Sequence, residues 1–137
     1  MRGPFGPLIY FSYIHNMNLG YACINTGLSA NKIMTNRTMR RKTLDEKGID
    51  YVSDLALANV KDLKTIIQWN NEMGIKLFRL SSQIFPWMEE YDWPDLKDYN
   101  EIVSIMLEIG NLATKTGQRL TMHPGPFHCL ASPNPKV

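Results

Sequence analysis

The sequence predicts an α/β fold built on a parallel sheet, and three observations lead to this prediction. Short apolar segments rich in strand-forming residues occur at 19–24, 75–80 and 118–122. An amphipathic helix is predicted before the second segment and another before the third. Each of these helices is followed at once by a glycine. Strands and helices that alternate in this way form the βαβαβ pattern, which requires the strands to run parallel.

Residues 1–16 precede the first predicted strand and are expected to lie outside the folded domain. They hold one arginine and a broken apolar stretch, without the small-residue cleavage site of a signal peptide. Because Met17 stands just before the first strand, residues 1–16 are interpreted as a possible non-native leader and 17–137 as the domain. Native protein that begins at Met1, detected by mass spectrometry, would contradict this interpretation.

The segment after the first strand, residues 26–48, is polar and basic and is predicted to be a long loop with one helical turn. Its central part holds five cations and no acid: Lys32, Arg37, Arg40, Arg41 and Lys42. Arginine forks together with Asn and Thr side chains suit phosphate oxygens. Charge alone is equally consistent with a solvated loop. The position directly after a strand, at the same edge as His123, favours the interpretation as a phosphate-binding loop.

Two helices are predicted from apolar residues that recur at three- and four-residue spacing. The first runs from Ser53, a candidate N-cap, to Met73, with Gly74 as its C′ residue. The second runs from Tyr99 to Thr116 and is closed by a glycine.

The loop after the second strand, residues 81–97, contains four carboxylates, Glu89, Glu90, Asp92 and Asp95. Together with a histidine they would offer the oxygen and nitrogen ligands that suit Mn, Zn or Fe. The alternative is a solvated loop whose negative charge favours the N-terminus of the following helix.

His123 ends the third predicted strand, and Pro124 and Gly125 turn the chain sharply after it. Neutral imidazole is a good ligand for divalent transition metals, although a single histidine is more often a surface or core residue. Aromatic residues gather at the same edge and would either stack on unpaired bases or pack in the core. Tyr21 lies within the first strand, Trp87, Tyr91 and Trp93 follow the second, and Phe127 follows the third. In parallel sheets these strand ends meet at one edge, where function is usually found.

Composition excludes some classes of protein. A formal net charge of +2 is too small to indicate nucleic-acid binding by itself, and no apolar run approaches the ~18 residues of a membrane span. The two cysteines, Cys23 and Cys129, are interpreted as reduced thiols. We therefore expect an intracellular protein, in the cytoplasm, nucleoid or nucleus.

Six segments, in this order and spacing, resemble the N-terminal part of UV damage endonucleases. They are LGYACIN, TNRTMR, NVKDLKTIIQWNNEMGIKLFRLSS, FPW, GQRLTMHPGPF and ASPNPKV. TNRT, a Phe-Arg-Leu-Ser-Ser strand and a His-Pro-Gly strand end are specific in combination, whereas each alone is weak. The resemblance covers residues 19–137.

The resemblance implies an α/β fold that is the N-terminal part, about three of eight βα units, of a TIM-type barrel like those of apurinic endonucleases and xylose isomerases. It implies divalent metal ions, typically manganese, at the mouth of the barrel. The implied activity is nicking of double-stranded DNA on the 5′ side of pyrimidine dimers and (6-4) photoproducts, with the lesion flipped out of the stack.

Site residues are carried over by the same resemblance. His123 matches a metal ligand, and Tyr21 and Asn25 match residues of the lesion pocket. The TNRT loop and the arginine after it lie near this pocket and are expected to bind DNA: Thr35, Asn36, Arg37, Thr38 and Arg40. Pro126 and Phe127 fall where the family has a glutamine and an aromatic residue that wedge into the duplex.

Three departures from the family pattern matter. Pro126 replaces the wedge glutamine, and Glu90 would have to serve as a metal ligand where the family often has the histidine of Pro-x-x-Ser-His. A TIM barrel also needs about 200–250 residues, so the remaining ligands are expected in a C-terminal barrel portion that this chain lacks. The alternatives are a metal-dependent barrel of the sugar isomerase or epimerase type and an inactive DNA-binding remnant.

Overall fold

A computed structural model describes residues 18–123 of the chain. The expectation for the segment 1–16 therefore lies outside the described residues. The elements follow the order β1 (Gly20–Ala22), α2 (Thr26–Ser29), α3 (Arg41–Glu72), β2 (Leu77–Leu80), η1 (Met88–Glu90), η2 (Trp93–Asp95), α4 (Tyr99–Thr116) and β3 (Arg119–Met122). The three strands lie in the order β1-β2-β3, and both pairs are parallel. The predicted parallel sheet is confirmed.

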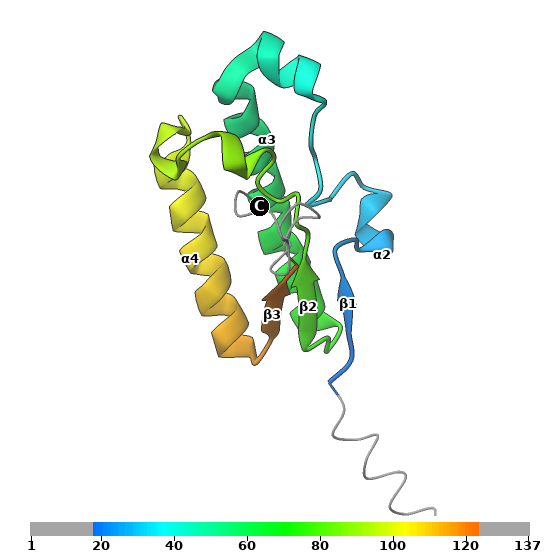
Figure 1. Cartoon of the computed structure of the whole chain (residues 1–137). Coiled ribbons are helices and arrows are strands. Elements are labelled where there is room, and N and C mark those ends of the chain that lie inside the picture. Colours follow the sequence, from blue (N-terminus) through cyan, green and yellow to red (C-terminus); the bar gives the residue numbers. More distant parts are fainter. Residues whose placement is uncertain (1–17, 124–137) are drawn as a thin grey trace, which may run out of the picture.

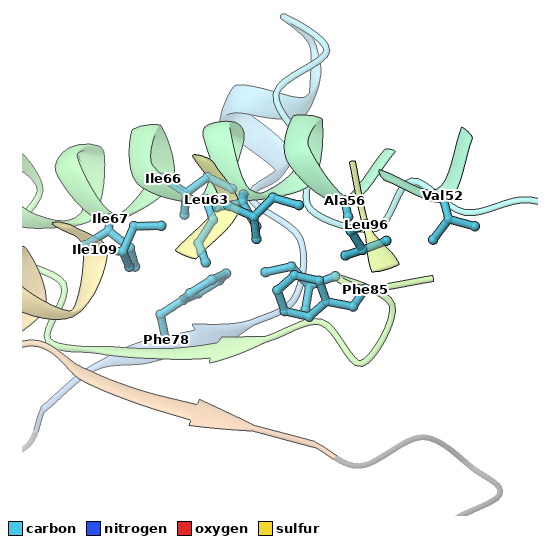
Figure 2. Close-up of a cluster of buried hydrophobic side chains, with 12 residues drawn as sticks. Val52, Ala56, Leu63, Ile66, Ile67, Phe78, Phe85, Leu96 and Ile109 are labelled. Atoms are coloured by element: carbon cyan, nitrogen blue, oxygen red, sulfur yellow. The ribbon is translucent and has the colours of Figure 1, made fainter. Parts of the chain in front are cut away.

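The two long helices cover one face of this sheet (Figures 1 and 2). Tyr21, Phe78 and Leu120 occupy the same row across the three strands. Phe78 is fully buried beneath α3, and its ring lies 4.9 Å from that of Tyr21. This row therefore points towards the helices.

The core lies between the sheet, the helices and the loop after β2. Its fully or almost fully buried members include one stripe of α3, two residues of α4 and three loop residues: Val52, Ala56, Val60, Leu63, Ile66, Ile67, Ile102, Ile109, Ile84, Phe85 and Leu96 (Figure 2). Each large apolar side chain buried in this way contributes about 1.5–3 kcal/mol to folding. The loop residues matter for function, because their burial fixes the chain that follows β2.

The other face of the sheet carries no helix within the described residues. Side chains alternate along a strand, so Leu77 and Arg79 point away from the buried Phe78, and Arg79 is exposed. The neighbouring positions on β1 are small: a Cβ added to Gly20 would lie 2.2 Å from the carbonyl oxygen of Leu77. Only glycine permits this close approach of β1 to β2.

The prediction for the start of the first helix was wrong. Helix α3 begins at Arg41, and Ser53 is a fully buried residue within it rather than its N-cap. Residues 41–47 are mostly good helix formers, and two i,i+4 ion pairs, Arg41–Asp45 and Lys42–Glu46, lie along them. Gly48 has φ 68° and ψ −168°, so it interrupts α3 with a kink and does not belong to a loop.

The helix ends and the short turn agree with the predictions. Gly74, which follows the C-cap Met73 of α3, and Gly117, the C-cap of α4, both adopt positive φ, of 70° and 67°. The expected single helical turn after the first strand is α2. Strand β1 is shorter than predicted, because Cys23 already leaves the extended conformation at φ 63°.

Candidate nucleic-acid interface and metal site

The candidate site is built from the chain that follows each strand at the carboxyl edge of the sheet. Residues 23–40 follow β1, residues 81–98 follow β2, and His123 follows β3. Figure 1 shows the three strands pointing the same way, with α2 and the two long loops beyond their tips. We call the first two segments the β1 loop and the β2 loop.

Tyr21 is the centre of a hydrogen-bonded chain at the end of β1. Its hydroxyl donates to Oδ1 of Asn70 on α3 at 2.7 Å and accepts from Nδ2 of Asn25 at 2.8 Å. Burial raises the pKa of the Tyr21 phenol, and the two side-chain hydrogen bonds partly oppose this effect. The hydroxyl is therefore neutral and held in one orientation.

Asn25 is almost completely buried and uses both ends of its amide. Its Oδ1 accepts from the backbone N–H of Leu28 at 3.0 Å, which caps α2. Thr35, the first residue of TNRT, is also buried, and its hydroxyl donates to the carbonyl of Cys23 at 3.3 Å. The two predicted lesion-pocket residues and the start of TNRT are thus brought together around the end of β1.

The remaining predicted DNA-binding residues of the β1 loop differ in their surroundings. The Arg37 guanidinium donates to Asp62 Oδ2 at 2.6 Å and to the carbonyls of Met34 and Lys32 at 2.6 and 2.8 Å. Asn36 is half-buried, whereas Thr38 and Arg40 are exposed. Within residues 18–123 the Arg40 guanidinium has no hydrogen-bond or ion-pair partner. The structure therefore distinguishes Arg37, which internal partners hold, from Arg40, which has no such partner among the described residues.

Glu90 and Trp87 join the β2 loop to the start of α3. Glu90 Oε1 accepts from the Arg41 guanidinium at 2.7 Å, and this guanidinium also lies 5.6 Å from the centre of the Trp87 ring. The Trp87 indole N–H donates to the carbonyl of Met39 at 3.1 Å. Trp87 itself has a left-handed backbone, with φ 56°, so these contacts hold a strained residue in place.

The proposed metal ligands are not assembled into a cluster by the described part of the chain. Among residues 18–123 no group of three or more His, Cys, Asp or Glu side chains lies close enough to hold a metal ion. His123 is exposed at the end of β3, and an imidazole there has the right chemistry for a divalent transition metal. Glu90 fits less well, because its carboxylate is paired with Arg41. Both assignments stay predictions.

Three residues expected from the sequence lie outside the described range: Pro126, Phe127 and Cys129. The structure also contains no helix, within the part it describes, that is long and apolar enough to cross a membrane.

Sequence reasoning missed the polar side chains that α3 contributes beneath the loops. Asn59, Asp62 and Asn70 lie on a helix for which the sequence predicts only a packing role. Asn59 and Asn70 are fully buried. The available signal was the position of both asparagines on the buried side of the helix, since a buried amide needs partners from another element.

Comparison with known proteins assigns a family to the chain. The model of the family described as UV-endonuclease UvdE matches residues 17–137. A protein of Acanthamoeba polyphaga mimivirus that is assigned as a UV-damage endonuclease is 43% identical over 122 residues, which are 88% of this chain and 37% of that protein. The UV-damage endonuclease of Schizosaccharomyces pombe is 38% identical over 121 residues, which are 87% of this chain and 20% of that protein.

A solved structure agrees with this match at the level of the fold. The crystal structure of SacUVDE is similar with a TM-score of 0.73 and 24% identity, covering 88% of this chain and 39% of that one. The expected fold, a part of an α/β barrel, is thereby confirmed. The chain spans well under half the length of the relatives that it matches. On the family match over residues 17–137, this chain belongs to the UV-endonuclease UvdE family.

Proposed function

We propose that this chain is the N-terminal part of a DNA repair endonuclease that nicks double-stranded DNA on the 5′ side of UV photoproducts. The proposed lesions are pyrimidine dimers and (6-4) photoproducts. The observation that carries the proposal is the family match over residues 17–137, together with relatives that are named UV-damage endonucleases. DNA is therefore the proposed partner.

The geometry of the β1 loop supports a role in holding a damaged nucleotide. Tyr21 and Asn25 are fixed next to each other by their hydrogen bond and lie at the carboxyl edge of the sheet. A flipped base needs a rigid pocket. The polar atoms of these two side chains bond to Asn70, Leu28 and each other, so the pair would fix the shape of such a pocket rather than bond to the base. The exposed Arg40 adds a charge for the phosphate backbone nearby along the chain.

Divalent metal ions, with manganese as the first choice, are proposed as the cofactor. Such ions would stabilise the charge that develops on the phosphate and activate a water molecule. In this chain His123 would be one ligand, and Glu90 a second if it exchanges its Arg41 partner for the metal. The other ligands would come from the rest of the barrel.

A C-terminal barrel portion is accordingly proposed as a necessary partner of this chain. The face of the sheet that no described helix covers fits this proposal. In a closed barrel it would face the interior, where layers of side chains fill the space. Arg79 points to that face, so the completing portion is expected to place a carboxylate opposite it.

The test uses the chain completed with the C-terminal barrel portion of the mimivirus relative. With Mn²⁺ we expect this protein to nick a duplex that carries one cyclobutane dimer and to leave the undamaged duplex intact. A protein that binds Mn²⁺ but leaves both duplexes intact would contradict the proposal. Conversion of an aldose to a ketose by the same preparation would point to the sugar isomerase alternative.

A further inference from the structure

The side chain of Asn59 joins the β1 loop to the β2 loop. Its Oδ1 accepts from the backbone N–H of Arg37 at 3.0 Å, and its Nδ2 donates to the carbonyl of the same residue at 3.0 Å. Nδ2 also donates to the carbonyl of Ile84 in the β2 loop at 3.1 Å. A single, fully buried amide thus pairs with one loop as a neighbouring strand would, and holds the second loop against it.

Asp62, three residues further along the same face of α3, completes this attachment. Its Oδ2 accepts from the backbone N–H of Met34 at 3.0 Å and from the guanidinium of Arg37 at 2.6 Å. The carboxylate and the guanidinium are both largely shielded, with side-chain exposures of 22% and 26%. A hydrogen-bonded charge pair in such a setting is stronger than one in open solvent.

Arg37 is therefore turned towards the protein rather than towards a ligand. Three of the five N–H groups of its guanidinium donate to Asp62, Met34 and Lys32, and the Asp62 carboxylate already balances its charge. Arg40, three residues later, is exposed and has no such partner among the described residues. Arg37, within TNRT, and Arg40, just after it, thus have different surroundings.

We propose that Asn59 and Asp62 are positioning residues for DNA binding, which fix the β1 loop through Arg37 so that Arg40 offers its charge to the phosphate backbone. This inference rests on the proposed function, since it presupposes that the loop meets DNA. It assigns the contact to Arg40 and removes Arg37 from the phosphate-binding set.

The experiment uses this chain joined to the C-terminal barrel portion of the mimivirus relative, with two measurements on the same variants. Hydrogen exchange reports whether residues 34–37 and 83–85 stay protected. Fluorescence anisotropy, at several salt concentrations, reports binding to a labelled duplex with one cyclobutane dimer. The variants are Asn59→Ala, Arg37→Ala and Arg40→Ala. Ser53→Ala is the matched control, because Ser53 is fully buried on the same helix and bonds to Asp98, at the far end of the β2 loop and outside the two segments that exchange monitors.

Asn59→Ala is expected to speed exchange in both loop segments at least tenfold, with residues 63–71 of α3 unchanged, and to weaken DNA binding about tenfold. Arg37→Ala should have the same two effects. The double variant with Asn59→Ala and Arg37→Ala should bind DNA no more weakly than either single variant, because both substitutions act through one attachment. Arg40→Ala should leave exchange unchanged and reduce the slope of log K against log salt by about 0.9, the value for one phosphate contact. The control should match the wild-type chain in DNA affinity.

Two results would overturn the proposal. If Arg37→Ala reduces the slope of log K against log salt by about 0.9 without faster hydrogen exchange in the loops, Arg37 binds phosphate directly. If Asn59→Ala loosens the loops but binds DNA as well as the control does, the attachment has no role in DNA binding. Should Asn59→Ala fail to fold, Asp62→Asn tests the same attachment at a partly exposed side chain, because it removes the charge that holds the Arg37 guanidinium. If the completed protein without substitutions has protected loops and no affinity for this duplex, the proposed function is contradicted instead.

Discussion

At the scale of single residues, buried side-chain amides form hydrogen bonds with backbone groups of the two loops. Asn25, Asn59 and Asn70 are all at least nine-tenths buried. Asn25 and Asn70 both bond to the Tyr21 hydroxyl, whereas Asn59 bonds to the backbone of Arg37. A polar group in such a place is costly unless it is paired, and its pairing fixes the geometry around it. The site residues that the sequence indicated are oriented by these amides.

Tyr21→Phe tests the hydrogen-bonded chain at the end of β1. The change leaves the ring on Phe78 but removes the partner of Asn25 Nδ2 and of Asn70 Oδ1. We expect a loss of about 1–3 kcal/mol in the free energy of unfolding, because both amides lose a partner in a shielded place. Urea denaturation followed by circular dichroism measures it. An unchanged midpoint would show that the amides are not held by this hydroxyl.

Tyr91→Phe should raise the free energy of unfolding, whereas Tyr21→Phe should lower it. The Tyr91 hydroxyl is buried and has no hydrogen-bond partner among the described residues, so its removal should stabilise the chain by about 1 kcal/mol at neutral pH.

The pH dependence of stability gives a second readout for the same variant. Burial, with a smaller contribution from the charge of Glu89, raises the pKa of Tyr91 to about 12. The folded state therefore favours the neutral phenol. Its contribution is complete below the unfolded pKa of about 10 and is lost as the pH rises through about 12. The midpoint difference between Tyr91→Phe and wild type should widen from pH 9 to 11. A constant difference would contradict the raised pKa.

At the scale of elements, α3 carries the largest difference between sequence and structure. The strands and the far ends of both helices could be predicted, because periodicity and closing glycines act locally. The start of α3 could not, since Gly48 resembles a loop residue and only its backbone angles show it to be a kink. The partners of Asn59 lie 22 and 25 residues away in the chain, so no local pattern reports them.

Gly48→Ala tests the kink, with Gly110→Ala as its control. Gly48 has φ 68° and ψ −168°, a region almost restricted to glycine, so alanine should cost about 1–3 kcal/mol even though nothing lies within 4 Å of the added Cβ. Gly110 lies inside α4 with equally open space, where alanine should stabilise by about 0.4–1 kcal/mol. Thermal unfolding of both variants measures the pair. Equal shifts would mean that α3 is straight in solution.

At the scale of the whole molecule, helices cover one face of the sheet (Figure 1), and no helix among residues 18–123 covers the other. The apolar stripes of α3 and α4 close the first (Figure 2), whereas Arg79 and the small residues of β1 lie on the second. The sequence indicated the barrel and the three strand-end segments. The full set of metal ligands could not be predicted. Of the two proposed ligands, Glu90 is paired with Arg41, and no group of three or more possible ligands lies together in the described residues.

Completion of the barrel should therefore stabilise this chain. We expect a higher thermal midpoint, and slower hydrogen exchange in β1 and β3, when the C-terminal portion of the mimivirus relative is joined to it, since both outer strands would gain a neighbour. Arg79→Ala should lower that midpoint in the completed protein more than in the chain alone. Equal effects would show that Arg79 finds no partner in the completing portion.

The most direct measurement of the central claim is the position of the cut. An end-labelled duplex with one cyclobutane dimer is incubated with the completed protein and Mn²⁺, and the products are sized at single-nucleotide resolution. We predict one product that ends on the 5′ side of the dimer, and its loss in His123→Ala, whose fold is checked by circular dichroism. Cutting at random positions, or full activity in His123→Ala, would contradict the account.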